Sequence, residues 1–352
     1  MMEKYRINPS NGMEFGLYSL GDHIANPLTG ERISAQQRIK ELIEASKLAE
    51  EAGIAVFGVG ESHQTYFTTQ AHSVVLGAIA QATSKIKISS SATVLSVSDP
   101  VRVYEDFATI DLISDGRAEI VAGRGSRVGA YHLLGVDLQD YEEIFEEKLE
   151  LLKKINEEKY VTWQGEFRPP LKNAEVLPQP LNGQLPIWRA VGGPPASAIK
   201  AGYMGIPMML TTLGGPAINF KHSVDAYREA AESSGFDSKT LPIATTSLFY
   251  VADTTKEALQ GMYPHINGGF QAIRGGGYPK QQFAQAPDTR DALMVGSTQQ
   301  IIEKILYQYE LFGMQRFMAP IDFGGVPFEK IMKNIEVIGN DIIPAIKKYT
   351  AN

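Results

Sequence analysis

The stretch Ser98–Ser126, SDPVRVYEDFATIDLISDGRAEIVAGRGS, decides the fold because it holds a complete helix, turn and strand. Asp99 is a favourable N-cap, and Pro100 suits the first helical position, where no N–H is needed. Gly116 is expected to end this helix, since glycine readily adopts the left-handed conformation common at helix ends. The apolar run Ala118–Ala122 then predicts a short buried strand. A helix that leads directly into a buried strand is the repeating unit of a parallel α/β protein.

The same alternation of strand and helix continues along the chain. Strands are expected at residues 14–20, 55–60, 86–95, 118–122, 187–191, 208–213, 244–252 and 315–321. Besides the helix after Asp99, helices are expected at residues 34–51, 71–83, 141–158, 195–204, 216–234, 297–312 and 327–348. Eight β/α units most simply close into a TIM barrel, because a doubly wound sheet usually has fewer strands. We therefore predict one α/β domain over residues 1–352, with ligands bound where the strands end.

Two segments do not fit this alternation. Residues 161–185 are rich in Pro, Gly and Asn and are expected to form a long connection. Tyr263–Val295, with the runs GGF, RGGGYPKQQ and QAPD, is expected to be an irregular insertion after the seventh strand. Long loops in compact domains are often functional, so this insertion is a candidate lid over a ligand.

Composition narrows the classes of protein. The chain has 352 residues, of which 43% are hydrophobic, so a large core can form. It has no cysteine, which excludes disulfides, thiolate metal sites and cysteine nucleophiles. A net charge of −7 argues against a nucleic-acid partner, although a local cationic pocket is compatible with it. The N-terminus lacks an apolar signal region and the apolar runs are too short to span a bilayer, so we expect a cytoplasmic protein without membrane contact.

Arg124 is the first candidate ligand-binding residue. It leaves the carboxyl end of a predicted strand between glycines, with Gly125 and Ser126 after it. A guanidinium with neighbouring backbone N–H groups suits a phosphate or a carboxylate. A surface arginine or a structural ion pair explains the same pattern, and both interpretations remain open. The segment departs from the dinucleotide fingerprint G-x-G-x-x-G because Val128 stands at the third glycine and no helix is expected to begin there.

A second candidate anion site lies in the run IWRAVGGPPAS at residues 187–197. A predicted strand ends at Gly192 and Gly193, and two prolines then start a helix with Ser197 in its first turn. A helix N-terminus carries a partial positive charge and unpaired N–H groups, which suit a phosphate. An ordinary strand-to-helix turn is also compatible with this composition. Barrels, however, often bind phosphate at this face near a short helix, so the two candidate sites support each other.

Glu61 and His63 follow the second predicted strand. Their position makes them candidates for acid–base chemistry or for substrate contact. A polar strand end satisfied by local hydrogen bonds is the alternative interpretation. Asp22 with His23, and His132, are further candidates at the same face. No H-E-x-x-H or comparable spacing occurs, so no metal site is expected.

Four motifs together resemble the bacterial luciferase-like family of flavin-dependent oxidoreductases. They are GVGESH at 58–63, the opening stretch, PIWRAVGGPPASAIKAGYMGIPMMLT at 186–211 and VGSTQQIIEKILYQYELFGMQRF at 295–317. The resemblance runs in the same order from about Glu14 to Tyr349. It implies a TIM barrel with an irregular insertion after the seventh strand. It also implies reduced FMN bound at the carboxyl face, usually in a dimer.

The resemblance assigns residues to the cofactor. The phosphate-binding arginine of the family falls on Arg124, and the serine or threonine that contacts the phosphate falls on Ser197 after the two glycines. A non-proline cis peptide beneath the flavin ring would fall between Ser91 and Ala92.

One departure from the family concerns catalysis. Members commonly carry Glu-His-His after the second strand, with the first histidine tied to catalysis, whereas this sequence has Ser62 at that place. Serine cannot act as a base near neutral pH, so either His63 takes over or the reaction needs no base there. Luciferase-type aldehyde oxidation and light emission are therefore not expected.

The resulting hypothesis is an FMN-dependent monooxygenase or oxidoreductase that uses reduced FMN and oxygen on a small organic substrate. Because no separate nicotinamide fingerprint is present, reduced flavin is expected to come from a partner reductase, and a homodimer is expected. Three alternatives remain: a deazaflavin-dependent reductase, a flavin-binding protein without turnover, and an unrelated phosphate-binding barrel such as an aldolase or isomerase.

Overall fold

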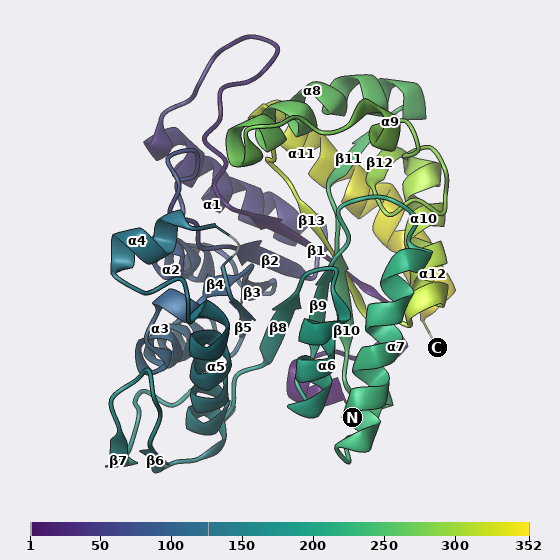
Figure 1. The fold of residues 1–352 in the computed structure, drawn as a ribbon. Coiled ribbons are helices and arrows are strands. Elements are labelled where there is room, and N and C mark those ends of the chain that lie inside the picture. The colour runs from purple at the N-terminus through teal and green to yellow at the C-terminus, as the bar shows by residue number, and fades with distance from the viewer. Residues whose placement is uncertain (1, 126, 352) are drawn as a thin grey trace.

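The computed structural model describes residues 2–125 and 127–351, and it confirms the predicted TIM barrel (Figure 1). The barrel strands are β1 (Glu14–Ser19), β2 (Val56–Val59), β3 (Lys87–Ser90), β4 (Thr93–Val94), β5 (Ala118–Gly123), β8 (Ile187–Val191), β9 (Met208–Thr211), β10 (Ile243–Thr246) and β13 (Arg316–Pro320). They are all parallel and follow the order β3-β2-β1-β13-β10-β9-β8-β5, and β5 closes the ring by pairing with β3. All the strands therefore end at one mouth of the barrel.

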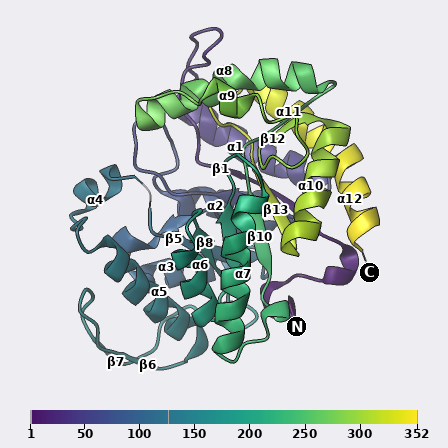
Figure 2. The same ribbon diagram turned by 45° about the vertical axis from the view of Figure 1, so that its right-hand side comes forward.

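The remaining elements cover this barrel. Figures 1 and 2 show the helices on its outside, and they show α8 and α9 beside the small sheet of β11 and β12. The helices are α1 (Ala35–Glu51), α2 (His72–Ala82), α3 (Pro100–Ile113), α4 (Gly129–Leu134), α5 (Tyr141–Glu157), α6 (Pro195–Tyr203), α7 (Ile218–Ser233), α8 (Thr255–Arg274), α9 (Lys280–Phe283), α10 (Thr298–Phe312), α11 (Phe328–Val337) and α12 (Ile343–Thr350). The short helical turns are η1 (Met2–Tyr5), η2 (Pro9–Asn11), η3 (Leu95–Val97), η4 (Ser238–Thr240) and the π-helical η5 (Ile338–Ile342). Two small sheets pair β11 (Phe249–Ala252) with β12 (Met294–Ser297), and β6 (Val161–Trp163) with β7 (Leu171–Ala174).

The opening stretch folds as its sequence predicts. The Asp99 side chain accepts a hydrogen bond from the backbone N–H of Val101 at the start of α3. Gly116 has a φ of 84°, in the left-handed region that glycine favours. Phe107 and Ile110 face the core and are buried. Local capping and one apolar face are therefore enough to fix this unit.

Two expected strands are each divided in the structure. Residues 86–95 form β3 and β4 rather than one strand, and a cis peptide bond joins Ser91 to Ala92 between them, at the predicted place. Residues 244–252 form β10 in the barrel and β11 outside it, where β11 pairs with β12. Both divided segments are largely buried, and an apolar run does not reveal a change of partner strand.

The prediction of an irregular insertion over Tyr263–Val295 is wrong for the first third of that range. Residues 263–274 belong to α8, which begins with a capping box between Thr254 and Glu257. Pro264 and the glycines of GGF suggested a loop, but Gly269 serves packing, because a Cβ there would lie 2.6 Å from Cε1 of Phe323. The irregular part is shorter and includes α9, and its last residues belong to β12.

A charged network closes the amino ends of the barrel strands. Arg316 is fully buried and donates to both carboxylate oxygens of Glu119, at 2.7 and 3.1 Å. It also pairs with Glu14 at 2.8 Å, and Lys87 pairs with Glu14 at 2.5 Å. This end of the barrel is filled by structural ion pairs, so ligand chemistry is left to the opposite mouth.

Within residues 2–125 and 127–351, no helix has both the length and the apolar character needed to cross a bilayer.

Candidate functional site

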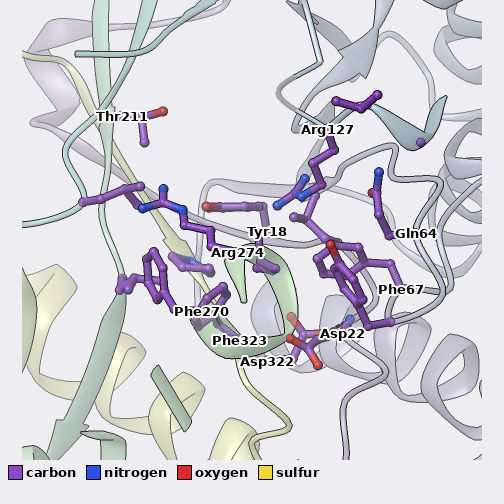
Figure 3. A pocket seen from close by; sticks show the side chains of 18 residues that line it. Tyr18, Asp22, Gln64, Phe67, Arg127, Thr211, Phe270, Arg274, Asp322 and Phe323 are labelled. Carbon is purple, nitrogen blue, oxygen red and sulfur yellow. Dashed lines mark hydrogen bonds between the residues drawn. The ribbon is translucent and has the colours of Figure 1, made fainter. Parts of the chain in front are cut away.

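A cavity of about 590 Å³ lies at the carboxyl mouth of the barrel (Figure 3). Its wall comes from the segments after β1, β2, β5, β9, β10 and β13 and from the last turns of α8. The lining residues are Tyr18, Leu20, Asp22, Gln64, Tyr66, Phe67, Arg127, Val128, Gly129, Thr211, Leu213, Leu248, Phe270, Ile273, Arg274, Pro320, Asp322 and Phe323. A volume of this size suits a small organic ligand.

Glu61 and His63, the predicted acid–base pair, are in contact. Nε2 of His63 lies 2.7 Å from Oε1 of Glu61, so one proton is held between the two groups. The other carboxylate oxygen, Oε2, accepts a hydrogen bond of 2.7 Å from the backbone N–H of Val94 in β4. The backbone N–H of Glu61 donates to the carbonyl of Ala92 at 2.9 Å. Glu61 therefore fixes the carboxyl end of β2 to the divided strand beside it.

Burial sets the protonation of this cluster. It raises the pKa of Glu61, although the hydrogen bonds from His63 and Val94 act in the opposite direction. Burial also lowers the pKa of the neighbouring His72 to about 3, and the charge of His63 adds to this effect. His72 is therefore neutral near pH 7, and its Nε2 lies 2.8 Å from Oγ1 of Thr93.

Ser62 does not enter this cluster. Its hydroxyl donates to Oε1 of Gln64 at 2.7 Å and is buried. The side chain thus orients Gln64, which lines the cavity.

Arg124, the first predicted anion ligand, is engaged by a carboxylate. Its Nη1 lies 2.6 Å from Oε1 of Glu142 in the first turn of α5, and the Tyr141 hydroxyl donates to the same oxygen at 3.1 Å. The Arg124 side chain keeps 31% of its surface exposed. Gly125 has a φ of 79°, and a Cβ there would lie 2.5 Å from Cγ1 of Val94. Ser126, predicted to join this site, lies outside the described residues.

Ser197, the second predicted anion ligand, lies beside a buried arginine. Nε of Arg189 donates to Oγ of Ser197 at 3.2 Å, and the two terminal nitrogens hold Glu146 at 2.6 and 2.7 Å. Because Oγ accepts this bond, the hydroxyl proton of Ser197 is available to a further acceptor. No side chain caps the first turn of α6, where Ser197 lies. Burial alone would raise the pKa of Glu146, but the hydrogen bonds and charge of Arg189 and Lys200 lower it.

Helix α5 connects the two predicted anion ligands. Glu142, which binds Arg124, and Glu146, which binds Arg189, are four residues apart and therefore lie on one face of α5. The predicted turn of Gly192 and Gly193 lies just before α6, and the carbonyl of Gly193 accepts a hydrogen bond from Ser223 at 2.8 Å. Arg124 thus contacts α5 directly, and Ser197 is linked to it through Arg189.

The predicted cofactor residues and the cavity are formed by different side chains. Glu61, His63, Arg124 and Ser197 do not line the 590 Å³ cavity, nor does the Ser91-Ala92 pair. The cavity carries two cations that sequence reasoning missed, Arg127 and Arg274. Arg127 follows the glycine–arginine run closely, and Arg274 precedes three glycines in the insertion. A single arginine in a loop belongs to no motif of fixed spacing, so the sequence alone did not indicate that either residue binds a ligand. His23 and His132 do not line the cavity either.

Within the described ranges, no three His, Asp or Glu side chains are grouped as metal binding requires.

Comparisons with known proteins agree with this architecture. The sequence profile of the luciferase-like monooxygenase family matches residues 13–316. The oxygenase component of a flavin-dependent trigonelline monooxygenase from Acinetobacter baylyi is 24% identical over 90% of this chain and 94% of its own.

Two solved structures share the fold. The oxygenating constituent of 3,6-diketocamphane monooxygenase from Pseudomonas putida, in complex with FMN, has a TM-score of 0.75 at 18% identity, over 95% of this chain and 98% of its own. An F420-dependent secondary alcohol dehydrogenase with an F420-acetone adduct has a TM-score of 0.72 at 19% identity, over 95% of this chain and 99% of its own. The profile match covers most of the chain and excludes an unrelated aldolase or isomerase barrel. The chain therefore belongs to the luciferase-like monooxygenase family.

Proposed function

We propose that this protein is an FMN-dependent monooxygenase that uses reduced FMN and oxygen on a small organic substrate. The observation that carries the proposal is that Arg124 pairs with Glu142 and the Ser197-bonded Arg189 pairs with Glu146, both on one face of α5, at the same mouth as a small-molecule cavity. Arg124 and Ser197 each come from a different βα segment, and each is held by α5 or its partners. A single phosphate near α5 accounts for both sites.

The residues present fit FMN. Arg124, the Ser197 hydroxyl and the backbone around Gly125 and Gly192-Gly193 would hold its phosphate. The Ser91-Ala92 segment would lie beneath its ring. The Ser91 hydroxyl is buried and has no hydrogen-bond partner within the described residues, which leaves a polar atom for a ligand. Gly60 gives that segment room, because a Cβ there would lie 2.3 Å from the Ser91 carbonyl oxygen.

Reduced FMN, when bound, supplies the electrons that activate oxygen, and the protein supplies orientation, a proton and exclusion of water. Nε2 of His63 and Oε1 of Glu61 lie 2.7 Å apart beside β4 and share a hydrogen bond. Burial raises the pKa of Glu61, and we propose that this carboxyl group exchanges a proton with its ligand.

Titration with FMN, followed by the change in its visible spectrum, tests the cofactor assignment. We expect saturable binding by the native chain and binding about ten- to a hundred-fold weaker for Arg124→Ala, the effect of one charged hydrogen bond. Arg102→Ala is the control, because Arg102 is exposed on α3 and is expected to leave the affinity unchanged. Unchanged affinity in a folded Arg124→Ala variant would contradict the assignment.

The deazaflavin alternative is supported by the structural similarity to the F420-dependent alcohol dehydrogenase. The two cofactors are distinguished by titrating the same preparation with each. Tighter binding of the deazaflavin than of FMN would favour a reductase over a monooxygenase.

Turnover and partners need a separate experiment. We propose a homodimer that receives reduced FMN from a partner reductase. Oxygen uptake should exceed that of free reduced FMN when a flavin reductase and NADH are added, and light scattering should give twice the chain mass. Tight FMN binding with no extra oxygen uptake would favour a flavin-binding protein without turnover.

A further inference from the structure

Arg127 lines the cavity without an anionic partner. Its Cζ lies 4.9 Å from the ring centroid of Phe67, and its Nε is buried with no hydrogen-bond partner in the described part of the chain. No carboxylate oxygen in residues 2–125 and 127–351 lies within 4.0 Å of its nitrogens. A half-buried cation without an ion-pair partner is unfavourable, and partial burial lowers the pKa of Arg127 accordingly. The missing negative charge points to a ligand.

Arg274 lies across the cavity from Arg127. It is the last residue of α8, and its Cζ lies 4.7 Å from the ring centroid of Phe270. The described residues give its side chain no ion pair. In Figure 3, Tyr18 lies between the guanidinium groups of Arg127 and Arg274. The like charge of Arg274 also acts to lower the pKa of Arg127, so an anion between them would relieve this repulsion.

Two aspartates line the same cavity, and the charge of Asp22 acts to raise the pKa of Arg127, but neither carboxylate lies within 4.0 Å of a nitrogen of Arg127 or Arg274. Asp22 accepts hydrogen bonds from the backbone N–H groups of Ile24 at 3.0 Å and Gly324 at 2.8 Å. Asp322 accepts from the Ser19 hydroxyl at 2.6 Å and from the backbone of Asp22 at 3.1 Å. Both carboxylates are thus committed to the loops after β1 and β13. Within the described residues neither arginine has an ion-pair partner, so both guanidinium groups are open to an external anion.

The rest of the wall is apolar and largely aromatic. Phe67, Phe270 and Phe323 contribute ring faces and edges, and the rings of Phe270 and Phe323 meet edge to face at 5.6 Å. Such a wall suits the hydrocarbon part of a ligand, while a few polar groups fix its orientation. Guanidinium forks match a planar carboxylate, which they can bind through two parallel hydrogen bonds.

We propose that this cavity selects substrates that carry a carboxylate on an aromatic or aliphatic body, and that Arg127 and Arg274 bind this carboxylate. That the bound acid is a substrate rests on the proposed monooxygenase function. The binding of an anion by Arg127 and Arg274 does not depend on that function. The other possible source of an anion is the phosphate of the cofactor, which is assigned to Arg124 and Ser197 beside α5. The two sources make different predictions for variants of Arg127.

Calorimetric titration of the purified protein, with and without FMN, tests this proposal. The probes are benzoate, phenylacetate and hexanoate, each compared with its neutral amide. We expect at least one acid to bind about tenfold or more tightly than its amide, and we expect Arg127→Met to remove this preference. Arg127→Lys should keep part of it, because the charge remains without the fork.

Further variants keep the test decisive if Arg127→Met does not fold. Arg274→Gln changes an exposed residue and should weaken acid binding a few-fold, whereas Arg102→Gln on α3 should change nothing. Equal binding of every acid and its amide, or no binding of any acid, would overturn the proposal. The proposal would also be overturned if the Arg127→Met variant bound FMN more weakly but bound the acids as before. Arg127 would then bind the cofactor rather than the acid. Acid selectivity without any FMN binding would support the anion site and refute the proposed function.

Discussion

At the scale of single residues, the molecule separates cations that have partners from cations that lack them. Arg189 and Arg316 are fully buried, and each holds a carboxylate through two hydrogen bonds. Arg124 has one carboxylate contact and remains partly exposed, whereas Arg127 has none within the described residues. Sequence reasoning identified Arg124 because glycines flank it. It missed Arg127, since the absence of a counterion is a property of the fold.

The buried aspartates at the mouth also belong to this scale. Burial raises the pKa of Asp22 to about 7, and the charge of Asp322 adds to the effect. The folded chain therefore keeps a proton that the unfolded chain releases above about pH 4. The stability associated with this proton is present at low pH and is lost as pH rises through about 7.

Asp322→Asn tests this linkage. The substitution can keep both hydrogen bonds that Asp322 accepts at Oδ2, and it removes the charge beside Asp22. We expect the fall in unfolding free energy between pH 5 and pH 8, measured by urea denaturation, to be smaller than in the native chain. Asp253→Asn is the control, because its side chain is 79% exposed. Parallel pH profiles for the native chain and Asp322→Asn would contradict the linkage.

At the scale of elements, capping and periodicity predicted much of the secondary structure. The expected N-cap Asp99 accepts a backbone hydrogen bond, and Ser34 and Ser297 do the same at the starts of the helices expected at residues 34–51 and 297–312. Prediction failed in α8, where Pro264 and Gly269 look like loop residues. Tertiary packing decides their role, because Gly269 leaves space for Phe323 at the cavity wall. A sequence pattern does not show what a glycine packs against.

Gly269 and Gly77 both lie in helices, and comparing their substitution by alanine tests whether packing requires Gly269. A Cβ at Gly269 in α8 would lie 2.6 Å from Phe323, whereas a Cβ at Gly77 in α2 would meet nothing within 4 Å. We expect Gly77→Ala to stabilise the chain by about 0.5–1 kcal/mol. Gly269→Ala should destabilise it by roughly 1–3 kcal/mol through overpacking. Urea unfolding measures both, and stabilisation by Gly269→Ala would show that the close approach is not needed.

At the scale of the whole molecule, the two ends of the barrel have different roles. Ion pairs around Arg316 fill the amino end, and the carboxyl mouth holds the cavity, the Glu61–His63 pair and the cations beside α5. Counting β/α units predicted the barrel and the mouth at which the cavity lies. It could not predict that Glu142 binds Arg124, or that the cavity has its own arginines, since these contacts join segments that only the closed barrel brings together.

A crystal structure of the protein with FMN tests the central claim most directly. Glu142 now lies 2.6 Å from Nη1 of Arg124, so a phosphate that binds through this nitrogen must displace it. We predict the phosphate within hydrogen-bonding reach of Arg124 and the Ser197 hydroxyl, about 2.6–3.2 Å, with Glu142 withdrawn and the flavin ring over Ser91 and Ala92. A phosphate bound elsewhere, with the Arg124–Glu142 pair intact, would contradict the assignment of this mouth as a flavin site.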